Sequence, residues 1–133
     1  MHYISREDYL RTMYHLYEKG RDIKSIEIAK ELDISKASVS EMIRKLSKEG
    51  YIVVKPYSSI RFTEKGLTEA KRMMRNHRVI EVFLKNVLDY NIVDVHDEAH
   101  RLEHAFSEES IKRLNDFLKN PIVSPYGNPI PRK

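Results

Sequence analysis

The sequence contains no cysteine, so it has neither a disulfide framework nor a cysteine-ligated zinc site. It also has no apolar run near the roughly 20 residues that a transmembrane helix needs. Its N-terminal stretch, MHYISREDY, does not contain the apolar core of a signal peptide. We therefore expect a cytoplasmic protein that makes no contact with a membrane.

Positive charge is concentrated in one part of the chain. The whole sequence has 24 Lys and Arg residues against 20 Asp and Glu, a formal net charge of +4. Between Lys36 and Arg75 there are 10 basic residues and only 4 acidic ones. A basic region suits the phosphate backbone of a nucleic acid, although a solvated charged surface would have the same composition.

Cap and turn residues divide the first half of the chain into three helices and a hairpin. Ser5 and Asp8 match a capping box, which marks a helix start, and apolar residues at helical spacing follow as far as Gly20. The expected elements are helices from Ser5 to Gly20, over Ser25–Leu32 and over Lys36–Glu49, and strands over Tyr51–Lys55 and Ile60–Phe62 joined by a turn at Pro56–Ser59. This order predicts a mainly α protein whose residues 1–73 form a winged helix-turn-helix DNA-binding domain.

The third expected helix presents polar side chains that suit double-stranded DNA. Ser38 and Ser40 are short enough to approach base edges, and Glu41 could accept a hydrogen bond from a cytosine amino group. Lysines on the same face suit phosphates. The predicted DNA-binding residues are Ser35, Lys36, Ala37, Ser38, Ser40, Glu41, Lys45 and Lys48. A domain of this kind can instead mediate protein contacts, and the basic excess favours DNA.

The second half of the chain is expected to be helical. Apolar spacing predicts a helix over Glu64–Leu88, with a kink or break near Asn76, and further helices over Asp94–Ala105 and Glu108–Leu118. Ser107 is the expected cap of the last one. The tail after residue 120 holds four of the five prolines and no helical period.

Histidine is enriched in this helical half, where four of the six histidines lie. At about 100° per residue, one helical face carries three of them and a glutamate within an arc of about 100°. Protonated imidazoles on one face would repel one another, whereas neutral imidazoles and a carboxylate are good ligands of a divalent cation. The candidate ligands are His96, His100, Glu103 and His104 on that face, and the i, i+4 pair His77 and Glu81. The pattern predicts a metal site.

An enzymatic alternative exists for the same residues. His100, Glu103 and His104 match H-x-x-E-H, the inverted zinc-protease motif, in which the glutamate acts as a general base. Such an enzyme needs a further ligand from a large scaffold and a substrate cleft with an open metal position. Only three acidic residues follow His104, all on the next expected helix. We keep a zinc metalloprotease as the alternative and expect no enzymatic activity.

The two halves together resemble the diphtheria toxin repressor family of iron- and manganese-dependent repressors, which includes the manganese transport regulators. The resemblance is strongest over residues 8–14, 76–78, 95–104 and 124–131. It implies a winged helix-turn-helix followed by a helical metal-binding and dimerisation domain, here residues 74–133. It also implies a homodimer bound to a palindromic operator. The printed sequence ends without the SH3-like domain of many relatives, so we expect the two-domain form.

The resemblance further implies two metal positions and an anion position, with Fe²⁺ or Mn²⁺ as co-repressor and Zn²⁺, Co²⁺ or Ni²⁺ able to bind in vitro. The implied ligands are Asp8, His100, Glu103 and His104 at a regulatory site, His77, Glu81 and His96 at an ancillary site, and Arg78, Ser124 and Asn128 around an anion. Asp8 is typical of the manganese regulators, whereas His100 is typical of neither metal group. Asp8 can also be read as only the second half of a capping box, and Asn128 as part of a turn.

Overall fold

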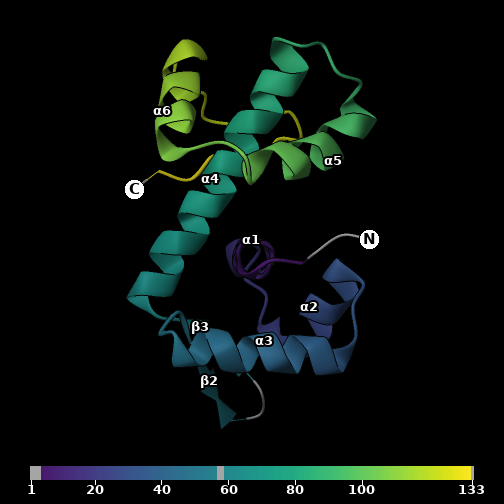
Figure 1. The fold of residues 1–133 in the computed structure, drawn as a ribbon, viewed down its shortest axis with the longest axis vertical. Helices are drawn as coiled ribbons and strands as arrows, with labels where there is room; N and C mark the ends of the chain where they lie inside the picture. Colours follow the sequence, from purple (N-terminus) through teal and green to yellow (C-terminus); the bar gives the residue numbers. More distant parts are fainter. Residues whose placement is uncertain (1–3, 57–58, 133) are drawn as a thin grey trace. The chain divides into compact units, whose positions relative to one another are not determined.

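The computed structural model describes residues 4–56 and 59–132. The chain forms two compact units, residues 1–73 and 74–133. The first contains α1 (Arg6–Glu18), β1 (Ile23–Lys24), α2 (Ser25–Leu32), α3 (Lys36–Lys48), β2 (Ile52–Lys55), β3 (Ser59–Phe62) and the start of α4 (Glu64–Asn86) (Figure 1). The second contains the rest of α4, then α5 (Ile92–Glu103) and α6 (Glu108–Phe117). This order confirms the expected mainly α fold with a winged helix-turn-helix.

Serine caps set the starts of three helices where the sequence predicts them. Ser5 forms a full capping box with Asp8 at the start of α1. The Ser35 hydroxyl accepts a hydrogen bond from the Ser38 N–H at 3.1 Å, and the Ser107 hydroxyl accepts one from the Ser110 N–H at 3.0 Å. Each cap satisfies a backbone donor that has no partner within the helix, so the helix begins at the residue after the cap.

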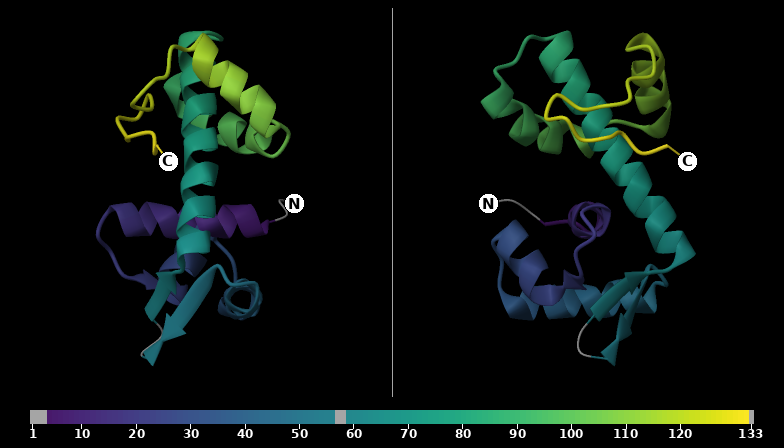
Figure 2. Two further views of the ribbon diagram at one scale, coloured as in Figure 1. Left: turned by 90° about the vertical axis from the view of Figure 1, so that its left-hand side faces the viewer. Right: turned by 180° about the vertical axis from the view of Figure 1, so that it is seen from behind.

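The hairpin of β2 and β3 gains a third strand that the sequence does not signal. The antiparallel order is β1-β3-β2, with Ile23 opposite Ile60 and Ile52 opposite Phe62. A two-residue strand such as β1 is too short to show the alternation by which strands are identified. In the expected turn at Pro56–Ser59, Tyr57 and Ser58 lie outside the described residues. Figure 2 shows the hairpin beside α3, which β2 contacts.

One continuous helix replaces the expected break near Asn76. α4 runs over 23 residues, and no proline interrupts it. The Asn76 side-chain N–H donates to Glu108 at 2.9 Å, so this polar residue connects α4 to the start of α6 instead of breaking the helix. One apolar core cluster of the second unit is formed by Ile80, Leu84, Val95, Ala99 and Ile111.

The boundaries of α5 differ from the expected Asp94–Ala105. The helix begins two residues earlier because the Asn91 side chain accepts a hydrogen bond from the Val93 N–H at 3.2 Å. It ends at Glu103, so His104 is the C-terminal cap residue. Within the described part of the chain, no helix is long and apolar enough to cross a membrane.

Gly66 lies in the first turn of α4, against the backbone of Tyr51 just before β2. We refer to the hairpin of β2 and β3 as the wing. A Cβ atom built on Gly66 would lie 1.7 Å from the carbonyl oxygen of Tyr51. Thr63 reinforces the same contact, because its hydroxyl donates to the Gly50 carbonyl at 2.6 Å and its N–H donates to Tyr51 at 3.1 Å. Glycine is therefore required here for close approach of two backbones.

We expect Gly66→Ala to destabilise the protein. In an ordinary helix, alanine is favoured over glycine by about 1 kcal/mol, whereas overpacking here should cost about 1–3 kcal/mol. Urea unfolding of this variant, compared with Thr68→Ala at an exposed position of α4, measures the difference. A Gly66→Ala protein at least as stable as the wild type would contradict the contact.

Candidate functional site

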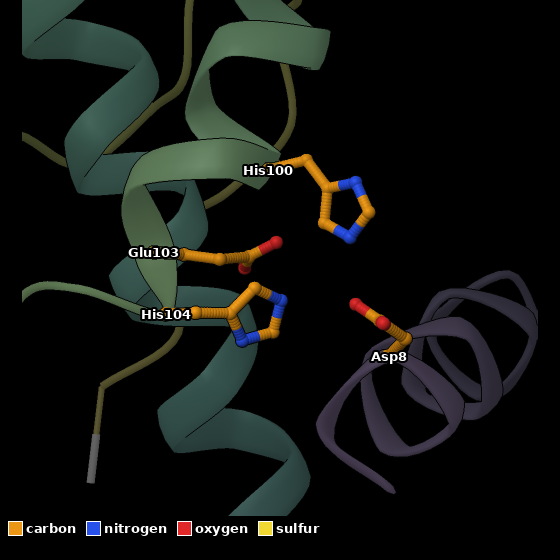
Figure 3. Close-up of side chains that lie close together, drawn as sticks. All are labelled: Asp8, His100, Glu103 and His104. Carbon is orange, nitrogen blue, oxygen red and sulfur yellow. The ribbon is translucent and has the colours of Figure 1, made fainter. Parts of the chain in front are cut away.

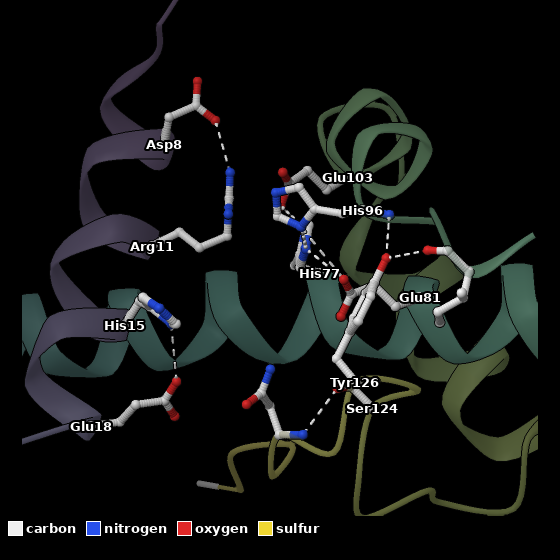
Figure 4. Close-up of polar contacts among 12 residues, drawn as sticks. Asp8, Arg11, His15, Glu18, His77, Glu81, His96, Glu103, Ser124 and Tyr126 are labelled. Carbon is white, nitrogen blue, oxygen red and sulfur yellow. Dashed lines mark hydrogen bonds and ion pairs between the residues drawn. The ribbon is translucent and has the colours of Figure 1, made fainter. Parts of the chain in front are cut away.

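Two histidines and a glutamate meet between α4 and α5. His77 Nε2 lies 3.1 Å from Glu81 Oε2 and 3.2 Å from His96 Nδ1 (Figure 4). His96 Nδ1 lies 3.6 Å from Glu81 Oε2. The side chains of His77 and Glu81 are 4% and 3% exposed, whereas that of His96 is 54% exposed. We refer to these three residues as the α4–α5 cluster.

The separations within the α4–α5 cluster fit a metal ion. Nitrogen and oxygen ligands about 2.1 Å from a shared ion lie about 3–3.5 Å from one another. The three donor atoms are 3.1, 3.2 and 3.6 Å apart. Two imidazole nitrogens and one carboxylate oxygen also suit divalent first-row metals. Both the geometry and the donor set are therefore compatible with the predicted ancillary site.

Glu81 is held in the ionised form that a metal requires. Burial raises the pKa of Glu81, but hydrogen bonds with His77 and His96 and the positive charge of these imidazoles outweigh it. The net result is a pKa lowered from 4.5 to about 2. The carboxylate is consequently charged throughout the physiological pH range.

A second group of candidate ligands lies at the end of α5. His100, Glu103 and His104 each offer a donor atom, and these atoms lie within 4.8 Å of one another. Figure 3 shows the three side chains extending from the last turn of α5. The rings of His100 and His104 have centroids 5.5 Å apart. We refer to these three residues as the α5-terminal cluster.

Asp8, the fourth predicted ligand of the regulatory site, belongs to α1 in the first unit (Figure 3). Its Oδ2 accepts hydrogen bonds from the Ser5 N–H at 2.8 Å and from the Ser5 hydroxyl at 3.1 Å. Arg11, one turn later, places Nη2 3.8 Å from Asp8 Oδ1. The capping role of Asp8 is therefore present in the structure, and its role as a metal ligand stays a prediction.

Glu103 connects the two clusters. Its Oε2 lies 3.3 Å from His77 Nδ1, and the two side chains are 7% and 4% exposed. A carboxylate that accepts a hydrogen bond from the second ring nitrogen of a histidine ligand orients the ring, and Glu103 lies within ion-pair distance of that nitrogen of His77. The family resemblance assigns Glu103 and His77 to separate sites, and only the packing of α4 against α5 brings them together.

The predicted anion-binding residues lie close together near the C-terminus. Arg78 is 2% exposed and donates through Nη1 to the Pro129 carbonyl at 2.6 Å. The Ser124 hydroxyl accepts hydrogen bonds from the N–H groups of Asn128 at 3.2 Å and Tyr126 at 3.3 Å. These contacts are all with protein backbone, and the anion-binding role of Arg78, Ser124 and Asn128 stays a prediction.

Tyr126 has a site contact that the sequence did not indicate. Its hydroxyl donates to the Ile92 carbonyl at 2.6 Å and accepts from the His96 N–H at 3.1 Å. Burial raises the pKa of Tyr126, the hydrogen bond with the His96 backbone opposes this increase, and the nearby carboxylate of Glu81 adds to it, so that the pKa is raised. The available signal was its position between Ser124 and Asn128, in a stretch that resembles the repressor family.

The predicted DNA-binding residues are all on the surface of α3 or at its N-terminus. Val39, Ile43 and Leu46 face the core of the first unit. The exposed residues are Ser35, Lys36, Ala37, Ser38, Ser40, Glu41, Lys45 and Lys48. Lys45 and Glu41 form an exposed ion pair at 3.8 Å. Both strands of the wing add an exposed basic residue, Lys55 and Arg61.

Two family models together match most of the chain. The model described as the N-terminal DNA binding domain of iron dependent repressors matches residues 3–60. The model described as their metal binding and dimerisation domain matches residues 63–132.

Similar proteins include repressors and regulators. The sequence is 41% identical over 125 residues to the diphtheria toxin repressor of Corynebacterium diphtheriae, covering 94% of this chain and 55% of that one. It is 40% identical to an uncharacterised HTH-type transcriptional regulator of Methanocaldococcus jannaschii, covering 86% and 93%. The structure of the manganese regulator SloR has a TM-score of 0.86 at 39% identity, covering 96% and 60%. The chain thus spans little more than half of the diphtheria toxin repressor.

The lowered pKa of Glu81 predicts how stability depends on pH. A carboxylate with a depressed pKa stabilises the folded state above pH 4.5, and this contribution is lost as the pH falls toward about 2. Glu81→Gln should therefore flatten the loss of stability over that window. Urea unfolding in EDTA between pH 7 and 2.5 tests this, with Glu98→Gln, from an α5 ion pair, as control. An unchanged pH profile for Glu81→Gln would contradict the assignment.

Proposed function

The chain belongs to the iron-dependent repressor family, and from this premise we propose that it is a metal-dependent, DNA-binding transcriptional repressor. The observation that carries the proposal is the convergence of His77, Glu81 and His96, with donor atoms 3.1–3.6 Å apart, within the region that matches a metal binding and dimerisation domain. Both family matches support a repressor over the zinc metalloprotease. The proposed activity is therefore regulated binding, without catalysis.

The proposed metal ligands divide into two sets. The regulatory set is Asp8, His100, Glu103 and His104, and the ancillary set is His77, Glu81 and His96. The proposed metal is Fe²⁺ or Mn²⁺, since similar proteins are named as iron-dependent or manganese regulators. A bound divalent cation supplies positive charge that balances the carboxylates of these sets.

In this proposal, Asp8 is the residue of the regulatory set that links metal binding to DNA binding. His100, Glu103 and His104 come from the C-terminal end of α5 in the second unit. Asp8 comes from the first turn of α1 in the first unit, which carries the proposed DNA-binding surface. Shared coordination by both units would link occupancy of the site to the position of the DNA-binding surface. Metal affinity and DNA affinity are then reciprocally coupled.

The proposed partner is a palindromic operator in double-stranded DNA, bound by a homodimer in the cytoplasm. Two copies of α3 would enter successive major grooves, as in other dimeric helix-turn-helix proteins. The exposed serines near the start of α3 would approach base edges, and Lys45 and Lys48 would contact phosphates. A match to a dimerisation domain over residues 63–132 supports the dimer.

Metal-dependent DNA binding by Asp8→Asn tests this function. The probe is an operator selected from random duplexes with the wild-type protein and Mn²⁺, and affinity is measured by fluorescence anisotropy with Mn²⁺ or with EDTA. We expect metal to raise wild-type affinity by about 5–150-fold and Asp8→Asn to lose most of this increase. Asparagine still accepts the capping hydrogen bond but is a poorer ligand.

His104→Ala is the companion variant, and it should lose metal binding and the DNA response together. A full metal response in Asp8→Asn would show that Asp8 is only a helix cap. No metal response in the wild type would contradict the proposed function itself.

Lysines of α3 should determine the salt dependence of DNA binding. Lys45→Ala and Lys48→Ala should each weaken binding to every duplex and reduce the slope of log affinity against log salt by about 0.9, because one phosphate contact is lost. Lys112→Ala, which removes an exposed lysine of α6, is the matched control. Unchanged slopes for both α3 variants would mean that another surface contacts DNA.

A further inference from the structure

The C-terminal residues 122–130 form a closed loop with Tyr126 at its tip. Ile130 donates to the Ile122 carbonyl at 2.9 Å, and the Ser124 N–H donates to the Asn128 carbonyl at 2.8 Å. Gly127 turns the chain with a φ of +84°, a value that side chains rarely allow. These contacts and the Ser124 hydroxyl hold the backbone on both sides of Tyr126. We refer to residues 122–130 as the C-terminal loop.

One end of the C-terminal loop is attached to α4. Ile130 is 4% exposed and packs in a core cluster with Val79 and Val82. The buried guanidinium of Arg78 donates to the Pro129 carbonyl at 2.6 Å. These α4 residues belong to the same two turns of the helix as His77 and Glu81, so the loop is anchored beside the two buried ligands of the α4–α5 cluster.

The tip of the C-terminal loop, Tyr126, is attached to α5 at His96, the third residue of the α4–α5 cluster. The Tyr126 hydroxyl contacts the backbone of His96 and of Ile92, one turn earlier. His96 needs such support, because its side chain is 54% exposed and protein packing restrains it less than the other two ligands. A phenol that both donates and accepts can hold one backbone N–H and one carbonyl at once.

We propose that Tyr126 is a positioning residue for the α4–α5 cluster: through the C-terminal loop it holds the backbone of His96 at the distance from α4 where His96 Nδ1 meets His77 Nε2 and Glu81. The inference rests on the proposed metal-binding function. It gives a role to a hydroxyl whose hydrogen bonds are with backbone groups of α5, and it explains why Arg78 and Ser124 are turned toward backbone groups of the loop.

The test isolates the α4–α5 cluster in a His100→Ala/His104→Ala background, which removes the α5-terminal cluster. Co²⁺ binding is measured by calorimetry and by visible absorption, with and without Tyr126→Phe. Loss of a group that orients a ligand typically weakens metal binding 10–100-fold, and we expect about tenfold together with an altered Co²⁺ spectrum. Tyr90→Phe, which removes another tyrosine hydroxyl from the same unit, should change neither.

Hydrogen exchange gives a readout that needs no metal. The His96 amide should exchange faster in Tyr126→Phe than in the background protein. Ser124→Ala, which removes the acceptor for the Tyr126 and Asn128 N–H groups, should weaken Co²⁺ binding in the same direction. This weakening should persist in sulfate-free and phosphate-free buffer, because the proposed role of Ser124 in the loop requires no anion.

Two results would overturn the proposal in different ways. Equal Co²⁺ affinity and equal spectra with and without the Tyr126 hydroxyl would remove the positioning role and leave the metal site intact. Absence of Co²⁺ binding in the background protein, with a folded NMR spectrum, would show that the α4–α5 cluster is not a metal site. That outcome would overturn both this inference and the ancillary part of the proposed function.

Discussion

The arrangement of the second unit depends on the imidazole of His77, because each of its nitrogens faces a buried carboxylate. Nε2 lies 3.1 Å from Glu81 and Nδ1 lies 3.3 Å from Glu103. Glu81 is on the same helix as His77, so of these two pairs only the one with Glu103 joins α5 to α4. A buried carboxylate without a partner is strongly unfavourable, so packings of α5 against α4 that keep this pair are favoured. The packing that achieves this also brings His96 within 3.2 Å of the same ring.

Two neighbouring faces of α5 have different roles: one contributes apolar residues to the core, and the other carries the candidate ligands. Val95 and Ala99 are fully buried against Ile80 and Leu84 of α4, and the next positions in the chain are His96 and His100. Successive helical residues point about 100° apart, so the rotation that buries the apolar pair also directs the two histidines to a neighbouring face. The arrangement of the candidate ligands on α5 therefore follows from apolar packing.

Local signals in the sequence were sufficient for most element boundaries. Ser5, Ser35 and Ser107 cap α1, α3 and α6 as predicted, since a cap involves only residues three or four apart. The two-residue strand β1 was not predicted, because it is too short to show an alternating pattern. It is defined only by its pairing with β3. The expected break near Asn76 was wrong because the side chain forms a tertiary hydrogen bond with Glu108.

In the candidate site too, features within one helix could be predicted from the sequence, whereas contacts between helices could not. Helical spacing placed His96, His100, Glu103 and His104 on one face, and the family resemblance separated His96 from the rest. Neither source predicted that Glu103 contacts His77, because this depends on how two helices pack.

The C-terminal loop extends this argument to residues far from the ligands in sequence. Arg78 and Ser124 use their polar atoms on backbone groups of the loop, and Tyr126 uses its hydroxyl on the backbone of α5. Arg78 and Ser124 satisfy partly buried backbone groups of the loop, whereas the contacts of Tyr126 with the α5 backbone are exposed. In the proposed arrangement, the C-terminal loop contacts α4 through Pro129 and α5 through Tyr126, and the α5 contact is made at the backbone of the exposed ligand His96.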